Sequence, residues 1–278
     1  MTGIIWLASY PKSGNTWFRV FLTNLLRDAD EPADINDLEA TPISSARAIF
    51  DDETGIEAAD LTPEEIDRLR PRVYEHLAET ATETIFMKVH DAWTFLPDGS
   101  PLLSSAATRG AIYFVRNPLD VAISYAHHND TDIDKSIAYM GNGNHMLCSK
   151  AERLHSQLRQ KLLTWSGHVE SWLNAPGLNI HVMRYEDMLA RPLETFSRAV
   201  AYAGLPHDRA KIEKALRFSD FETLQAQEKE KGFKERSQVD DYFFRKGQAG
   251  QWQERLTPEQ VDRIVRDHGE VMRRFGYL

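Results

Sequence analysis

The sequence turns from an apolar run into a helical pattern at Ser9-Tyr10-Pro11-Lys12-Ser13-Gly14-Asn15-Thr16-Trp17. The run before it, Ile4 to Ala8, is short and bounded by turn residues, which is typical of a strand buried in a parallel sheet. Phe18 to Leu26, which follow, predict a buried helix. A strand that turns sharply into a helix gathers backbone N–H groups and the helix dipole at one point, so the stretch predicts a phosphate-binding turn. An ordinary turn with a solvated lysine is the alternative.

Composition favours one α/β domain over residues 1–278, because 42% hydrophobic and 27% charged residues are ordinary globular usage. The net charge of −9 argues against a nucleic-acid partner, so an anionic ligand requires a locally basic pocket. Cys148 is the single cysteine and excludes an intrachain disulfide. Neither a membrane-length apolar run of about 20 residues nor a signal-peptide pattern is present, so we expect a cytoplasmic protein without membrane attachment.

Strands and helices alternate along the rest of the chain. Strands are predicted at Thr84 to His90, Ala111 to Val115 and Leu178 to Met183. Helices are predicted from Thr62, with a break or kink at Pro71, and from Leu119, Leu154, Leu193, Ile212 and Thr257. The alternation predicts a central parallel sheet with helices on both faces.

Three segments lack a clear period and predict mobile loops around an acceptor site. They cover residues 28–60, which are acidic and interrupted by Pro32 and Pro42, 127–150 and 228–244. Residues 91–105 are a fourth candidate. Aromatic and Met side chains in or beside these segments suit a small or flat acceptor, although packing within their own loops is the alternative: Trp93, Phe95, Tyr125, Tyr139, Met140, Met146, Tyr242 and Phe243. We expect residues 228–244 to be poorly ordered without cofactor.

The opening turn differs from a Walker A loop in the position of its lysine. In G-x-x-x-x-G-K-[ST] the lysine follows the last glycine, whereas Lys12 precedes Gly14 here. The stretch still offers backbone donors, a lysine and the hydroxyls of Ser13 and Thr16, so phosphate binding remains the prediction.

Three separated motifs resemble those of the PAPS-dependent sulfotransferases. Residues 9–17 are similar to the 5′-phosphosulfate loop T-Y-P-K-S-G-T-T-W, and most of all to its bacterial form S-Y-P-K-[SA]-G-N-T-W. Residues 116–124, Arg-Asn-Pro-Leu-Asp-Val-Ala-Ile-Ser, resemble the 3′-phosphate motif R-N-P-x-D-x-x-x-S. Residues 245–252, Arg-Lys-Gly-Gln-Ala-Gly-Gln-Trp, resemble R-K-G-x-x-G-D-W. The motifs occur in family order and span most of the chain, which implies the P-loop-like sulfotransferase fold.

The resemblance implies a role for each matched residue toward the donor 3′-phosphoadenosine 5′-phosphosulfate (PAPS) and the product 3′-phosphoadenosine 5′-phosphate (PAP). Lys12 contacts the phosphate oxygen that leaves, and Trp17 lies near the adenine. The residues implied to bind the 5′-phosphate are Ser13, Gly14, Asn15 and Thr16. Those implied to bind the 3′-phosphate are Arg116, Ser124, Arg245, Lys246 and Gly247. Those implied to surround the adenine are Tyr185, Ser219 and Phe221.

His90 stands where the family places its general base, after a strand in a K-x-H pattern. A neutral imidazole can take the proton of an acceptor hydroxyl as its oxygen attacks sulfur in line. Lys88 is expected to stabilise charge on the transferring group, and the resemblance implies no metal. His127 and His128 are competitors for the base, with a solvated surface pair as the alternative, and a structural role remains an alternative for His90.

Two departures from the family pattern concern the C-terminal region. Gln251 replaces the aspartate of the R-K-G-x-x-G-D-W motif, so the way in which this loop closes on the cofactor is not predicted. The C-terminal dimerisation signature K-x-x-x-T-V-x-x-x-E is absent, so no particular dimer mode is predicted and a homodimer stays open.

The sequence therefore predicts a sulfotransferase that acts on a hydroxyl of a small-molecule or natural-product acceptor, such as a phenol or a glycopeptide. A nucleotide-dependent kinase is the first alternative, but it would require the lysine after the glycine and a magnesium ligand. A nucleotide-binding module without catalysis is the second, and Lys12, Lys88 and His90 argue against it.

Overall fold

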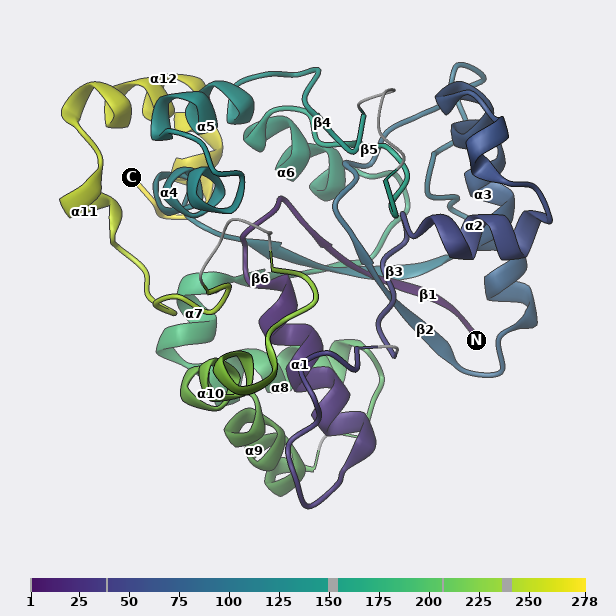
Figure 1. Ribbon diagram of the computed structural model, residues 1–278, viewed down its shortest axis with the longest axis horizontal. Coiled ribbons are helices and arrows are strands. Elements are labelled where there is room, and N and C mark those ends of the chain that lie inside the picture. Colours follow the sequence, from purple (N-terminus) through teal and green to yellow (C-terminus); the bar gives the residue numbers. More distant parts are fainter. Residues whose placement is uncertain (1, 39, 150–154, 207, 237–241) are drawn as a thin grey trace. The chain divides into compact units, whose positions relative to one another are not determined.

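The computed structural model describes residues 2–38, 40–149, 155–206, 208–236 and 242–278 (Figure 1). A central parallel sheet has the strand order β2-β1-β3-β6, formed by Thr84–Val89, Gly3–Ser9, Thr108–Val115 and Ile180–Arg184, with helices around it. The predicted α/β class and the four predicted strands are thereby confirmed. The chain divides into two compact units, which comprise Met1–Tyr10, Thr41–Tyr113 and Asn142–His181, and Pro11–Ala40, Phe114–Gly141 and Val182–Leu278.

The first unit is built on the pairing of β1 with β2. Every residue of β1 is buried, and the parallel register runs from Gly3 opposite Thr84 to Ala8 opposite Val89. Helix α3 (Pro63–Thr80) packs on β1, where Trp6 meets Tyr74 edge-on at 5.1 Å between ring centroids. The unit also contains α2 (Arg47–Thr54), the 3₁₀ turn η1 (Ala58–Asp60), α6 (Trp165–Leu173) and the antiparallel pair β4 (Met146–Leu147) and β5 (Gln160–Lys161).

The second unit is largely helical. Helix α1 (Asn15–Arg27) packs on α9 (Arg209–Phe218), which also contacts α8 (Pro192–Tyr202), and α7 (Tyr185–Ala190) contacts α8. Helix α4 (Pro118–His128) contacts α5 (Ile133–Met140), α11 (Trp252–Arg255) and α12 (Pro258–Arg274), which are grouped together in Figure 1. Helix α10 (Phe221–Lys231) completes the unit.

The predicted break at Pro71 is wrong, because α3 continues through this residue. Thr62 and Glu65 form a capping box that fixes the start of the helix. Ile66, Arg70 and Tyr74 are buried along one face. An interior proline costs about 3 kcal/mol, and tertiary packing of a long buried face can outweigh that cost.

Short elements interrupt the segments that were predicted to be irregular. Residues 28–60 contain α2, 129–150 contain α5, and 228–231 belong to α10. Asp132 caps α5 by accepting from the Lys135 N–H at 2.6 Å, and the helix buries Ile137 and Met140. Only these two of its apolar side chains are buried, and the helix is a short one that follows a polar stretch. The expected disorder of 228–244 concerns in part 237–241, which lie outside the described residues.

The helix predicted from Leu154 begins only at Trp165. Leu154 itself lies outside the described residues. Leu158, Gln160 and Leu162 are buried alternately in extended backbone, with Gln160 inside β5. The buried residue between the two leucines is a glutamine, so the sequence does not show the alternation of apolar and polar residues that is typical of a strand. The spacing of the leucines alone resembles that of a helix.

Candidate functional site

The turn before α1 has a backbone that only particular residues tolerate. Lys12 has φ 68° and Gly14 has φ 99°, both in the left-handed region. A Cβ atom on Gly14 would lie 2.8 Å from Cδ2 of Tyr185, so this position requires glycine both for its φ and for space. The first helical bond runs from the Phe18 N–H to the Gly14 carbonyl at 3.2 Å, which directs the preceding N–H groups out of the helix end.

Side chains of the turn are buried before any ligand binds. The Ser13 side chain is buried, and its hydroxyl has no hydrogen-bond partner among the described residues. Native proteins rarely leave such a buried group unsatisfied, and a bound ligand is one explanation for it. Asn15 and Thr16 are buried at the start of α1. Trp17 packs against Phe196 at 5.2 Å and Tyr185 at 6.3 Å between ring centroids, so its ring is also part of the core.

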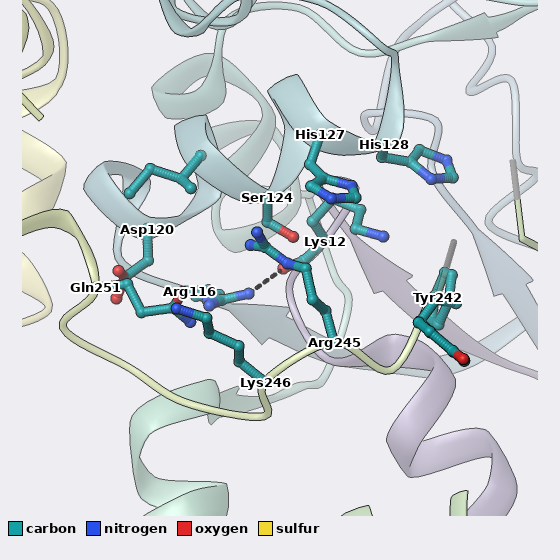
Figure 2. A pocket seen from close by; sticks show the side chains of 12 residues that line it. Lys12, Arg116, Asp120, Ser124, His127, His128, Tyr242, Arg245, Lys246 and Gln251 are labelled. Atoms are coloured by element: carbon teal, nitrogen blue, oxygen red, sulfur yellow. Dashed lines mark hydrogen bonds between the residues drawn. The ribbon is translucent and has the colours of Figure 1, made fainter. Parts of the chain in front are cut away.

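Arg116 connects two loops of the second unit. Its Nη1 donates to the Lys12 carbonyl and its Nη2 to the Gln248 carbonyl, both at 3.1 Å, and the first bond is drawn in Figure 2. Its guanidinium lies 4.3 Å from the centroid of the Tyr185 ring. Burial raises the pKa of Tyr185, and the charge of Arg116 opposes that rise. Arg116 Nε has no partner among the described residues, so the guanidinium retains a donor for a ligand.

Asp120 anchors the glycine-containing loop at residues 248–252, a role that sequence reasoning did not assign. Its Oδ2 accepts from the Gly250 N–H at 2.7 Å and its Oδ1 from the Trp252 N–H at 3.1 Å. Gln251 lies between these donors, and its amide donates to the Gln248 carbonyl at 3.4 Å. The loop is thus held by Asp120 through its own backbone N–H groups on both sides of Gln251.

These loops and α4 surround an open pocket of the second unit (Figure 2). In Figure 2 the side chain of Arg245 extends toward Ser124 and His127. Among the described residues, the pocket is lined by Lys12, Arg116, Asp120, Ile123, Ser124, His127, His128, Tyr242, Phe243, Arg245, Lys246 and Gln251.

The pocket is suited to an anion. Its lining combines the cations Lys12, Arg116, Arg245 and Lys246, whereas the carboxylate of Asp120 already accepts two backbone N–H groups. Lys12 Nζ lies 4.1 Å from the centroid of the Phe243 ring, a cation–π contact. Five of the predicted site residues, including Ser124, are therefore brought together, although their positions in the sequence extend from 12 to 246.

The predicted adenine residues lie beside these loops in the second unit. Gly247 has φ 58°, and a Cβ atom there would lie 2.5 Å from Cδ2 of Phe221. Ser219 is fully buried and its hydroxyl donates to the Ala215 carbonyl at 2.9 Å, so a direct bond to a nucleotide would require that hydroxyl to rotate. Tyr185 contacts Arg116 and faces Gly14.

His90 follows β2 in the first unit and has a defined tautomer. Its Nδ1 lies 2.8 Å from the Ser9 carbonyl oxygen and 3.3 Å from the Ser9 hydroxyl. A carbonyl oxygen only accepts, so Nδ1 carries the proton and Nε2 of the neutral ring carries the lone pair. This is the protonation that a general base acting through Nε2 requires.

A buried histidine, His168 of α6, holds the backbone of His90. Its Nε2 donates to the His90 carbonyl at 3.0 Å, and its Nδ1 accepts from the Tyr113 hydroxyl at 2.8 Å. The Tyr10 backbone bonds the same hydroxyl. Burial lowers the pKa of His168 to about 4, so the ring is neutral near pH 7. His168 was not singled out from the sequence.

The neighbours of His90 are fixed as well. Lys88 is buried, and its backbone pairs with both the Pro42 carbonyl and the Ser44 N–H at 2.8 Å. Asp91 is fully buried and accepts from Arg70 Nη2 at 2.6 Å and from the Lys161 N–H at 2.9 Å. Arg70 and Asp91 are far apart in the chain, and no motif joins them, so only the structure reveals this pair.

His127 and His128 line the pocket rather than forming a purely solvated pair, although the His127 side chain is exposed. Of the predicted acceptor aromatics, Tyr242 and Phe243 also line it. Trp93 instead packs edge-on against Trp172 at 5.3 Å. Tyr125 and Met140 are likewise buried in the core.

The described ranges show neither a metal-binding cluster nor a membrane-spanning helix. They contain no group of three or more His, Cys, Asp or Glu side chains placed to hold a metal ion. No helix within them is long and apolar enough to cross a membrane.

Comparison with known proteins gives consistent matches. The family model described as "Sulfotransferase domain" matches residues 3–276. Cytosolic sulfotransferase 16 of Arabidopsis thaliana is 26% identical over 275 residues, covering 93% of this chain and 72% of that protein. Flavonol 3-sulfotransferase of Flaveria bidentis is 23% identical over 276 residues, covering 94% of this chain and 78% of that protein.

Solved structures share the fold. Mouse sulfotransferase SULT7A1 complexed with PAP has a TM-score of 0.61 at 20% identity, covering 98% of this chain and 85% of that chain. Retinol dehydratase in complex with androsterone and PAP has a TM-score of 0.63 at 18% identity, covering 97% and 80%. The predicted sulfotransferase fold is therefore confirmed.

Proposed function

The chain belongs to the sulfotransferase domain family, and we propose that it transfers a sulfuryl group from PAPS to a hydroxyl of a small-molecule or natural-product acceptor, releasing PAP. The observation that carries the proposal is the pocket in which Lys12, Arg116, Ser124, Arg245 and Lys246 meet. PAPS carries negative charge at its phosphosulfate and again at its 3′-phosphate, and a pocket with cations from separate loops suits such a ligand.

The side chains take the following roles toward the donor. Arg116, Ser124, Arg245 and Lys246 bind the 3′-phosphate, with the Gly247 backbone. Ser13, Gly14, Asn15 and Thr16 bind the 5′-phosphate at the start of α1, where the hydroxyl of Ser13 is buried without a partner among the described residues. Trp17, Tyr185, Ser219 and Phe221 surround the adenine.

His90 acts as the general base through Nε2. The acceptor oxygen attacks sulfur as its proton passes to this nitrogen, and the bond between sulfur and the 5′-phosphate oxygen breaks. Lys12 stabilises the negative charge that develops on that leaving oxygen, and Lys88 stabilises the transferring group. The bond from His90 Nδ1 to the Ser9 carbonyl supports this assignment, since it leaves the lone pair on Nε2.

Calorimetry with PAP and with ADP tests the nucleotide assignment. Both ligands carry two phosphates, but PAP has one on the 3′ oxygen whereas ADP has both in its 5′-diphosphate. PAP should therefore bind more tightly, with an affinity that falls as salt increases. Equal or tighter binding of ADP would overturn the proposal. A screen of phenols, glycopeptides and sugars with labelled PAPS then identifies the acceptor class. The relatives named cytosolic support a cytoplasmic location.

A further inference from the structure

Glu228 is a buried carboxylate whose two oxygens are both used by one neighbouring segment. It lies on α10 with 3% of its surface exposed. Its Oε1 accepts from the Phe243 N–H at 2.7 Å, and its Oε2 accepts from the Phe244 N–H at 2.8 Å. Only a carboxylate offers acceptors at both ends, because a carboxamide replaces one oxygen by a donor. Burial of a carboxylate is costly, and these two bonds offset that cost.

Phe243 and Phe244 directly precede Arg245 and Lys246, so Glu228 fixes the backbone from which these two cations enter the pocket (Figure 2). The segment formed by residues 243–247 is called here the basic segment. Helix α10 holds it at two further points. Gln225 Nε2 donates to the Phe244 carbonyl at 3.1 Å, and the Phe221 ring lies against Gly247.

The Phe243 ring connects the same helix to Lys12. It packs against Phe233 at 4.9 Å and Phe244 at 5.1 Å between ring centroids. Lys12 Nζ lies over its face at 4.1 Å. Because the Phe243 N–H is bonded to Glu228, the position of this ring, and with it the surface under the Lys12 ammonium, depends on the carboxylate.

We propose that Glu228 is a positioning residue that presents the basic segment to the 3′-phosphate of the nucleotide. The proposal rests on the proposed function, since it assumes that Arg245 and Lys246 bind that phosphate. Glu228 touches no ligand itself. Its contribution is to fix the backbone of the segment before binding, so that less conformational freedom is lost when the 3′-phosphate binds.

The test measures PAP and ADP affinities by calorimetry for wild type, Glu228→Gln and Glu230→Gln. Glu230→Gln removes the same charge from an exposed position of the same helix and is the matched control. Glu228→Gln loses one of the two acceptors and places an amide donor against a backbone N–H. We expect it to weaken PAP about tenfold and ADP less than about twofold, which lowers the preference for PAP. Glu230→Gln should bind both as wild type does.

A purely structural role gives a different pattern. If Glu228→Gln lowers the melting temperature but leaves the ratio of PAP to ADP affinity unchanged, the proposal is wrong. Glu228→Asp retains both oxygens on a shorter side chain and provides a second folded variant. Its affinity for PAP should lie between those of wild type and Glu228→Gln. Failure of the proposed function itself is distinct, because wild type would then show no preference for PAP over ADP.

Discussion

His168 donates from Nε2 to the His90 carbonyl at 3.0 Å and so holds the backbone from which the His90 ring projects. The His168 side chain is fully buried. Its two ring nitrogens bond the His90 carbonyl and the Tyr113 hydroxyl, and no local sequence pattern predicts these long-range hydrogen bonds. Similar reasons apply to Asp120 and Glu228, whose partners are backbone N–H groups of a distant loop. Backbone donors carry no sequence signature.

His168→Leu should lower kcat by about tenfold to a hundredfold, because the His90 carbonyl loses its donor and the base is less well placed. Affinity for PAP, measured by calorimetry, should stay near wild type. His168→Gln retains an amide donor and should recover part of the activity.

The control is His268→Leu, which removes another buried neutral histidine, located on α12 of the second unit. This variant should lose stability without a comparable loss of kcat. Equal loss of kcat in both leucine variants would show that His168 acts only through general stability.

At the scale of elements, the strands were predicted well and the short elements poorly. Strands β1, β2 and β3 are apolar runs bounded by turn residues, so local pattern identifies them. By contrast, β5 includes the buried polar residue Gln160, and α5 is a helix of eight residues that begins at a cap formed by Asp132. The anion pocket could be predicted because its cations lie in three sequence motifs, two of which follow strands β1 and β3. The hydrogen bonds to Asp120 and Glu228 that hold the loops of the pocket could not be predicted.

Asp120→Asn tests whether α4 must anchor the loop at residues 248–252. The amide keeps one acceptor but places a donor against the N–H of Gly250 or Trp252. We expect PAP affinity to fall about tenfold, since the loop that joins Lys246 to α11 loses its fixed position. Asp262→Asn, an exposed change on α12, is the calorimetric control. Unchanged affinity of Asp120→Asn would contradict this account of loop closure.

At the scale of the whole molecule, charge is distributed unevenly. The chain carries a net charge of −9, yet cations from three motifs line the pocket. The net charge argued against a nucleic-acid partner and implied that an anionic ligand would require a locally basic pocket. The structure supplies that site within the second unit.

Stability should fall in mild acid because of two buried histidines. Burial lowers the pKa of His168 and of His268 from 6.5 to about 4, so the unfolded chain binds more protons than the folded chain between these values. The free energy of unfolding therefore decreases as the pH falls from 6.5 toward 4, by about 3 kcal/mol per histidine at most. Urea titrations at a series of pH values measure this slope. The double variant His168→Gln, His268→Gln should flatten it, and an unchanged slope would contradict the assignment.

The central claim is that Lys12 and His90 carry out sulfuryl transfer from PAPS. The most direct measurement is transfer of labelled sulfate from PAPS to an accepted phenol by wild type, Lys12→Ala and His90→Ala, with folding checked for each variant. We expect turnover by wild type and a loss of at least about a hundredfold in both variants. Turnover by His90→Ala near the wild-type rate, while Lys12→Ala is inactive, would contradict the assignment of His90 as the base.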